Sequence, residues 1–314
     1  MDGFRFPRRP MERRVFCSER KNRGPIVRAS NLDLAGRNVA QIIGVYDALS
    51  ARIADSFGFD WLHVGGYNLS GSRLGMPDVG LLTLTENIDA TRRIVEATNR
   101  PVLVDGDDGY GNYLKVIRLV REVESTGASA IHLEDQVLPK KCGHMSGKRI
   151  VPIQEFVAKV KAFVDTRRSD DFKLFARTDA VATDGFDAAI ERGNLYLEAG
   201  ADVIFIEAPT SMEQVTSIPA LVDGPVLYNW VFQGKSPLVP LADLATLGYE
   251  YCLQADVLYA VSYALRSYYR ELREKGSYGA VASQMIGFDE FNELVGYSRI
   301  SAAEEKYDPM RAQR

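Results

Sequence analysis

The sequence has little cysteine, no long apolar run and no strong excess of either charge. Its three cysteines, Cys17, Cys142 and Cys252, are odd in number and widely spaced, which argues against a disulfide framework or a cysteine-based zinc site. No apolar run approaches the roughly 18 residues that a transmembrane helix requires, so no membrane partner is expected. The net charge of −4 provides no basic field for nucleic acid. These absences together predict a cytoplasmic protein.

The N-terminal segment is basic and poor in acids, but it lacks the apolar core of a signal peptide. Organelle transit peptides share this basic character, yet the prolines and scattered acids here disfavour an amphipathic helix. We interpret residues 1–30 as a basic arm. With 46% hydrophobic and 25% charged residues overall, the chain can bury a large core. No linker rich in Pro, Gly or Ser divides it, so residues 31–314 are predicted to form one domain with a C-terminal helical extension.

One pattern recurs along the chain: a helical segment, a glycine, and a short strand that is apolar on both faces. Gly58, Gly127, Gly200 and Gly248 each stand at such a junction, where glycine ends a helix in the left-handed conformation. We predict eight strands, near residues 39–45, 61–66, 101–107, 130–135, 173–178, 203–208, 225–230 and 249–254. Alternating strands and helices of this kind indicate a parallel sheet. Eight units favour a closed (β/α)8 TIM barrel, with a doubly wound open sheet as the alternative.

Three of the connecting helices are visible in the sequence itself. Residues 113–126 and 186–199 each place apolar side chains on one face at helical spacing. A third helix is expected to start near Leu84, because Thr83 and Glu86 have the spacing of a capping box.

Acidic residues cluster where the third and fourth predicted strands end. Asp105, Asp107 and Asp108 lie close together among glycines, although like charges repel and glycine weakens a strand. A hard divalent cation, Mg²⁺ or Mn²⁺, would resolve this conflict because it prefers oxygen ligands. His132 and Glu134 point to the same side by strand alternation, so Glu134 could join the metal site and His132 could bind a substrate oxygen. An acidic solvated loop and a histidine packed in the core are the alternatives.

Polar side chains also end the next three predicted strands, namely Arg177, Glu207 and Asn229. In a TIM barrel the carboxyl ends of the strands build the active site. Arg177 could clamp a carboxylate while Glu207 holds the arginine or a hydroxyl, and Asn229 could add a neutral donor. A purely structural pair of Arg177 and Glu207 is the alternative.

The segment after the fourth strand is basic, flanked by glycines, and contains Cys142. We expect Lys140, Lys141 and His144 to lower the pKa of the thiol and to favour the thiolate. Glycines such as Gly143 would let the segment move as a lid that excludes water. An acid or base acting on an anionic intermediate would suit this position. A flexible basic loop with an incidental thiol is the alternative.

Several motifs together resemble the isocitrate lyase/phosphoenolpyruvate mutase superfamily, especially its 2-methylisocitrate lyase-like and carboxyphosphoenolpyruvate mutase-like members. The resemblance covers roughly residues 30–305. It is carried by Gly44-Val-Tyr-Asp-Ala-Leu-Ser50, Leu74-Gly-Met-Pro-Asp78, Asp105-Gly-Asp-Asp-Gly-Tyr-Gly-Asn112, Leu133-Glu-Asp-Gln136, Lys140-Lys-Cys-Gly-His144, Ala176-Arg-Thr-Asp-Ala180 and residues 291–300. The Lys140–His144 motif following the aspartate-rich turn is highly specific.

The resemblance implies a barrel whose last helices are exchanged between subunits, usually in a homotetramer. It also implies Mg²⁺ held by Asp105, with Asp107 and Glu134 binding directly or through water, and a small 2-oxo or 2-hydroxy carboxylate as substrate. The other implied or assigned site residues are Tyr46, Asp78, His132, Arg177 and Glu207 in catalysis, and Gly65, Gly66, Tyr67, Lys140, Gly143, His144, Asn229 and Trp230 in substrate binding. Cys142 would be the proton donor to the departing carbanion.

The sequence departs from the family pattern in four places. Gly65 stands where serine is usual, and Gly106 separates the two aspartates where alanine is common. The segments Trp230-Val-Phe-Gln233 and Leu253-Gln-Ala-Asp256 also differ from the usual sequences. The metal end of the site is thus kept and the leaving-group end is changed. Trp230 and Phe232 are expected to favour an apolar branch on the substrate.

The predicted reaction is therefore a metal-dependent carbon–carbon cleavage of a substituted malate, other than 2-methylisocitrate, to a 2-oxo acid and a second carboxylate. A phosphonomutase and a hydrolase or decarboxylase of oxaloacetate are the catalytic alternatives. A barrel kept only for binding is disfavoured, because the aspartates and the cysteine are retained.

Overall fold

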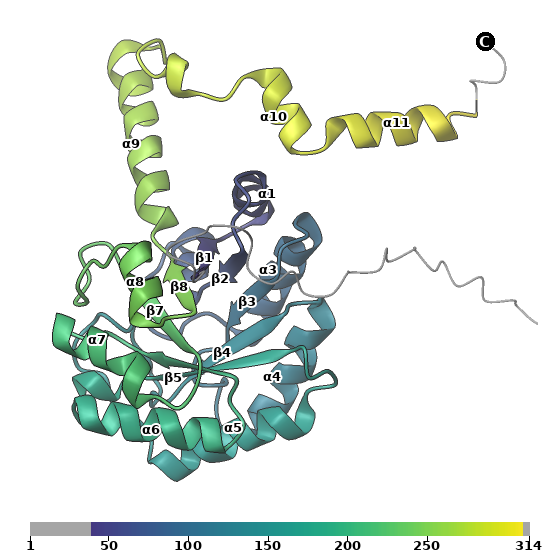
Figure 1. Cartoon of the computed structure of the whole chain (residues 1–314). Coiled ribbons are helices and arrows are strands. Elements are labelled where there is room, and N and C mark those ends of the chain that lie inside the picture. The colour runs from purple at the N-terminus through teal and green to yellow at the C-terminus, as the bar shows by residue number, and fades with distance from the viewer. Residues whose placement is uncertain (1–38, 310–314) are drawn as a thin grey trace, which may run out of the picture.

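The computed structural model describes residues 39–309, so the proposed arm over residues 1–30 lies outside the described part of the chain. A closed barrel of eight parallel strands forms the centre, and the last strand pairs with the first (Figure 1). The strands are β1 (Ala40–Val45), β2 (Trp61–Val64), β3 (Val102–Asp105), β4 (Ala130–Glu134), β5 (Lys173–Thr178), β6 (Val203–Ile206), β7 (Val226–Trp230) and β8 (Tyr251–Gln254). The predicted (β/α)8 TIM barrel is confirmed, and the open sheet is wrong.

Each strand separates two apolar cores. The inner core includes Trp61, Leu103, Phe175 and Leu253 and draws its buried residues from all eight strands and from no helix, so it fills the barrel lumen. The outer core packs the other strand faces against the surrounding helices. Because both faces of every strand are buried, the strands appear in the sequence as nearly continuous apolar runs.

Helices cover the outside of the barrel (Figure 1). They are α1 (Ala48–Ser56), α3 (Leu84–Ala97), α4 (Tyr113–Thr126), α5 (Ile153–Thr166), α6 (Phe186–Glu198), α7 (Met212–Leu221) and α8 (Leu241–Leu247), whereas the short helix α2 (Gly66–Leu69) directly follows the carboxyl end of β2. The capping box of α3 is confirmed, since Thr83 Oγ1 accepts the Glu86 N–H at 3.3 Å and Glu86 Oε2 accepts the Thr83 N–H at 2.9 Å. Gly127 ends α4 with φ of +87°, the left-handed conformation expected of it.

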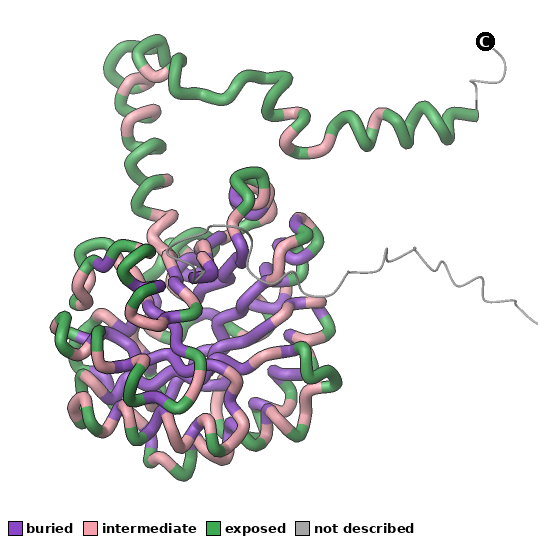
Figure 2. Tube along the Cα trace, viewed as in Figure 1, coloured by how far each residue is buried: buried purple, intermediate pink, exposed green. Residues whose placement is uncertain are grey.

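The C-terminal helices α9 (Val257–Lys275), α10 (Phe288–Leu294) and α11 (Tyr297–Tyr307) extend away from the barrel as an arm (Figure 1). No residue of these three helices is buried, as Figure 2 shows. Large apolar side chains on the arm are exposed, including Tyr263 at 75%, Phe288 at 82% and Ile300 at 63%. Within residues 39–309, no helix is both long and apolar enough to cross a membrane.

Candidate active site

A pocket lies where the carboxyl ends of the strands meet. Of the residues predicted to form the site, eleven line it: Gly65, Tyr67, Asp78, Asp105, His132, Cys142, Gly143, His144, Arg177, Glu207 and Asn229. The other described lining residues are His63, Asn68, Phe205, Val231, Leu253, Ala255, Asp256 and Tyr259. The barrel thus brings together side chains from distant parts of the sequence.

Asp105 ends β3 and is fixed by two backbone amides. The Gly66 N–H donates to Asp105 Oδ2 at 2.8 Å, and the Asp107 N–H donates to Oδ1 at 3.0 Å. Burial works to raise the pKa of Asp105, but the neighbouring His132 and Lys140 outweigh it and hold that pKa well below its usual value. Asp105 is therefore an ionised carboxylate inside the pocket.

Lys140 is buried between two carboxylates. Its Nζ lies 2.6 Å from Asp78 Oδ1 and 2.6 Å from Asp107 Oδ1. Burial alone would lower the pKa of Lys140, but the charges of Asp107, Asp105 and Asp78 keep it well above the usual value. We predicted a substrate contact for Lys140, yet it does not line the pocket; here it neutralises part of the acidic cluster.

At the two remaining carboxyls, burial outweighs the neighbouring cations, which are Lys140 beside Asp107 and Arg177 beside Glu134. Burial raises the pKa of Asp107 to about 7 and that of Glu134 well above its usual value. Glu134 Oε1 is buried and has no hydrogen-bond partner among residues 39–309. A Cβ on Gly66 would lie 3.1 Å from Asp105 Oδ2 and 3.3 Å from Asp107 Oδ1, so the backbone closely approaches both side chains. Three buried carboxyls with an unpartnered oxygen fit a hard divalent cation.

The third acid of the turn, Asp108, is held away from this cluster. Lys159 Nζ donates to the Asp108 backbone carbonyl at 2.7 Å and lies 3.8 Å from its carboxylate. Asp108 is not one of the described residues that line the pocket. Its position therefore points to a structural role.

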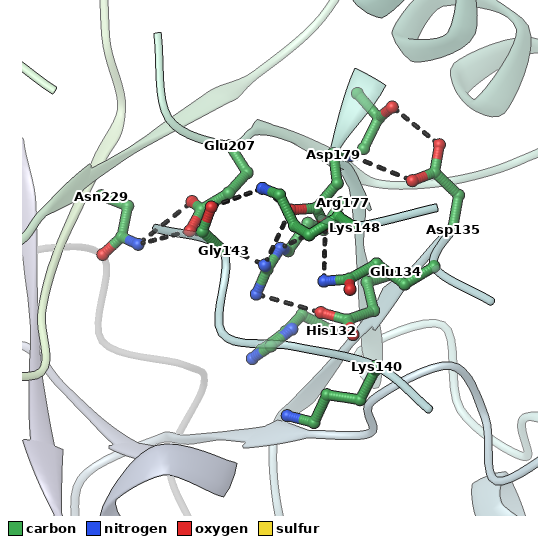
Figure 3. Close-up of polar contacts among 12 residues, drawn as sticks. His132, Glu134, Asp135, Lys140, Gly143, Lys148, Arg177, Asp179, Glu207 and Asn229 are labelled. Carbon is green, nitrogen blue, oxygen red and sulfur yellow. Dashed lines mark hydrogen bonds and ion pairs between the residues drawn. The ribbon is translucent and has the colours of Figure 1, made fainter. Parts of the chain in front are cut away.

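Arg177 lies at the centre of a buried network of carboxylates (Figure 3). Its Nε and Nη2 donate to Asp179 at 3.0 and 3.1 Å, and Nη1 lies 3.1 Å from Glu134 Oε2. Its Nη2 is 3.6 Å from Glu207 Oε1, which in turn accepts from Asn229 Nδ2 at 3.3 Å. These contacts hold the guanidinium in a fixed position in the pocket. Glu207 and Asn229 line the pocket as well.

Cys142 lines the pocket, but its thiol differs from the prediction. Burial raises the pKa of Cys142, so the expected thiolate is wrong. The two nearby lysines are engaged elsewhere: Lys140 binds carboxylates, and Lys141 Nζ donates to the Ser146 carbonyl at 3.1 Å. The side chain is therefore a protonated thiol at neutral pH, which suits a proton donor.

The segment around Cys142 is packed against Glu207. A Cβ on Gly143 would lie 1.7 Å from Glu207 Oε1, so only glycine fits there. His144 Nε2 lies 3.5 Å from the same oxygen, and Lys148 binds both the Gly143 carbonyl and Asp179 (Figure 3). These contacts hold the cysteine-bearing loop against the pocket.

The expected amide cradle lies at the start of α2. Gly65 precedes this helix and lines the pocket. The Gly66 N–H already donates a hydrogen bond to Asp105 Oδ2. The Tyr67 hydroxyl lies 3.1 Å from that of Tyr259 on α9, which covers this side of the site. Tyr46 lines an adjacent cleft that shares Tyr67, Asp78 and Tyr259 with the pocket.

Trp230 lies away from the pocket. By strand alternation in β7, Leu227 and Asn229 face inward, whereas Trp230 packs against the outer core. Phe232 is 60% exposed and does not line the pocket either. The specificity that we predicted for these two aromatics therefore lacks the necessary contact, and Val231 is the residue of this segment that lines the pocket.

His63 was missed by the sequence analysis. It lies on β2, is 4% exposed, and places its Nε2 3.0 Å from His132 Nε2. Burial lowers the pKa of both imidazoles, to about 3 for His63, so both are neutral at neutral pH. Within the described residues, His63, Asp105 and His132 also have side-chain atoms close enough to share one metal ion. Side chains alternate along β2, so His63 lies on the same face as Trp61. This alternation is the feature of the sequence that could have identified His63.

Comparison with known proteins defines the class. Residues 32–272 match the family model of phosphoenolpyruvate phosphomutase. The chain is 44% identical to 2,3-dimethylmalate lyase of Eubacterium barkeri, over 84% of this chain and 92% of that protein. It is 40% identical to 2-methylisocitrate lyase of Aeropyrum pernix, over 83% and 84%. A solved structure of oxaloacetate acetylhydrolase with the product oxalate matches with a TM-score of 0.79 at 32% identity, over 86% and 93%.

The chain therefore belongs to the isocitrate lyase/phosphoenolpyruvate mutase superfamily. Within it, the named lyases among its relatives support the class of carbon–carbon lyases.

Proposed function

We propose that this protein is a Mg²⁺-dependent lyase that cleaves a methyl-substituted malate to a 2-oxo acid and a second carboxylate. One observation carries the proposal: a protonated thiol, a fixed arginine and an ionised carboxylate, from Cys142, Arg177 and Asp105, line the same pocket. Cleavage next to a carboxylate needs an acid for the carbanion and positive charge for the oxo acid.

The charges of the pocket favour a dicarboxylate over a tricarboxylate. Arg177 is the sole Lys or Arg among the described residues that line it. Arg177 already faces the acidic Glu207 at 3.6 Å, and the rest of the lining includes a second acid, Asp256, and the apolar Val231, Leu253 and Ala255. A third carboxylate would meet acidic groups there, whereas methyl groups would meet apolar ones. We therefore favour 2,3-dimethylmalate, the compound for which the relative that is 44% identical is named.

Asp105, Asp107 and Glu134 would hold the cation, which would supply positive charge beside the 2-oxo oxygen. Arg177 would bind the carboxylate of the oxo-acid half, opposite Glu207 and Asn229. We assign removal of the C2 hydroxyl proton to Asp78, a buried carboxylate that lines the pocket. As the C2–C3 bond breaks, the electron pair stays on C3, and the Cys142 thiol donates its proton to that carbon.

Assembly and location are further parts of the proposal. The arm of α9, α10 and α11 exposes aromatic side chains such as Tyr263 and Phe288 and lacks buried residues. An exposed apolar surface of this kind marks a protein interface. We infer that copies of the chain exchange these arms in a homotetramer, measurable as a fourfold mass by light scattering. The cytoplasm is the proposed location, supported by the free thiols of Cys142 and Cys252.

A substrate panel tests the proposed reaction. The purified protein is incubated with 2,3-dimethylmalate, 2-methylisocitrate, oxaloacetate and phosphonopyruvate, with Mg²⁺ and with excess chelator, and the products are identified. We expect 2-oxo acid from 2,3-dimethylmalate, abolished by chelator. Preferred release of oxalate from oxaloacetate would instead make the protein a hydrolase. Oxalate, which a relative binds as its product, is proposed as a stable mimic of the oxo-acid half for binding experiments.

A further inference from the structure

The proposed reaction assigns no role to His63. Its imidazole lines the pocket and stacks on His132, with ring centroids 5.2 Å apart and planes inclined by 28°. His63 Nε2 and His132 Nε2 are 3.0 Å apart, a hydrogen-bonding distance. One of these nitrogens must therefore carry a proton and the other must accept it.

The neighbouring carboxylate decides which nitrogen donates. His132 Nε2 also lies 3.4 Å from Asp105 Oδ1. If His132 Nε2 were the acceptor, its lone pair would face Asp105 Oδ1, an oxygen that itself accepts the Asp107 N–H at 3.0 Å. The proton therefore belongs on His132 Nε2, and His63 Nε2 accepts it. A neutral imidazole carries its one proton on the other nitrogen when Nε2 accepts, so His63 has an N–H at Nδ1.

This N–H has no partner in the protein. His63 Nδ1 is buried and makes no hydrogen bond within residues 39–309. A buried donor without an acceptor destabilises the protein, so an acceptor is expected in the bound state. The same ring edge lies against Gly65: a Cβ there would be 2.8 Å from His63 Cε1 and 3.1 Å from Nδ1. The glycine at position 65 thus makes room for the imidazole beside the amide cradle.

We infer that His63 binds the substrate, donating its Nδ1–H to an anionic oxygen of the 2-oxo acid half beside Gly65. The inference rests on the proposed function for the nature of that ligand. A metal bound by both imidazoles is a weaker explanation. Metal-bound histidines almost always donate their second N–H, and neither His63 Nδ1 nor His132 Nδ1 has a partner among the described residues.

Two matched substitutions test the roles of the two ring nitrogens of His63 separately. The amide nitrogen of Asn can replace Nδ1–H, whereas the longer Gln can replace Nε2. Oxalate binding is measured by calorimetry with Mg²⁺ present, without turnover. We expect His63→Asn to bind oxalate within about threefold of the unmodified protein and His63→Gln to bind it about tenfold or more weakly, as loss of one hydrogen bond to an anion predicts.

The reverse order, or equal affinities in all three proteins, would overturn the role of Nδ1 and leave the proposed reaction intact. Failure of the unmodified protein to bind oxalate would overturn the proposed oxo-acid site and this inference together. A Co²⁺ absorption spectrum that changes in His63→Asn would identify a metal ligand and would also contradict the inference.

A second measurement needs no variant. The chain has three histidines, so ¹⁵N-histidine NMR spectra contain few signals. We expect one imidazole with a protonated Nδ1 and an unprotonated Nε2, whose Nδ1 signal shifts when oxalate binds. The opposite tautomer at His63, or an Nδ1 signal unaffected by saturating oxalate, would refute the assignment.

Discussion

The two ends of the pocket are built on different principles. Near β2–β4, Asp105 lines the pocket, and Asp107 and Lys140 lie outside the lining; all three are almost fully buried and are held by ion pairs and backbone hydrogen bonds. Near β7 and β8, Val231 and Ala255 are only partly buried and carry no charge. Removing a partner from a buried charge cluster leaves another charge uncompensated, whereas an apolar wall tolerates changes of size. The first end should therefore determine whether the reaction occurs, and the second which substrate reacts.

The largest effect is expected at the buried charged end. Asp105→Ala should lower turnover by several orders of magnitude and abolish oxalate binding, because it removes the ionised carboxylate of the metal site. Activity and circular dichroism are measured together. Asp108→Asn is the matched control: Lys159 holds Asp108 away from the pocket, so the melting temperature should fall while turnover persists. Full turnover of Asp105→Ala, or of the unmodified protein in excess chelator, would show that no metal acts there.

Cys142→Ser should have the next largest effect. A serine hydroxyl is a far weaker acid than a thiol, so kcat should fall by about 100-fold to 10,000-fold with little change in KM. Cys252→Ala is the control, because Cys252 is buried in the outer core and should affect stability instead. Near-normal kcat in Cys142→Ser would contradict a carbon–carbon lyase that uses this acid, and would favour a phosphoryl transfer.

The pH dependence of kcat follows from the same thiol. Burial raises the pKa of Cys142 above the ordinary 9.0, and the donor must be protonated to act. Activity should therefore be retained through neutral pH and lost only as the pH rises past 9. This alkaline decline should move or vanish in Cys142→Ser. A decline centred below pH 8 in the unmodified protein would indicate that the thiolate, not the thiol, is the resting form.

The smallest effect is expected at the apolar end, and it concerns selectivity. Val231→Ala should enlarge the wall of the pocket and raise the relative rate of malates with a larger substituent by about tenfold. Trp230→Met should leave these relative rates unchanged, because Trp230 packs behind the strand. Rates across a series of alkyl-substituted malates provide the measurement. If Trp230→Met changed the relative rates and Val231→Ala did not, the placement of these two side chains relative to the pocket would be wrong.

The fold was predictable because its signals are local. Strands buried on both faces, and a capping box such as Thr83 with Glu86, can be recognised in short segments. The convergence of Asp105, Arg177 and Glu207 was also predictable, since the carboxyl ends of barrel strands meet at one face.

The errors arose where a distant partner decides the chemistry. Lysines adjacent in sequence to Cys142 indicated a lowered pKa, but Lys140 is neutralised by Asp78 and Asp107 instead. His63 gained its importance only from His132, 69 residues further along the chain. Such pairings depend on the register between strands, which the composition of one strand does not reveal.

The most direct single measurement is the cleavage of 2,3-dimethylmalate in D₂O with Mg²⁺ present. Breaking the C2–C3 bond yields pyruvate and propionate, and the exchanged thiol of Cys142 delivers one deuteron to the propionate carbon next to its carboxylate. We predict equal amounts of the two products, one deuterium in each propionate, and no reaction in excess chelator. Absence of cleavage under these conditions, together with turnover of phosphonopyruvate or oxaloacetate, would contradict the proposed lyase.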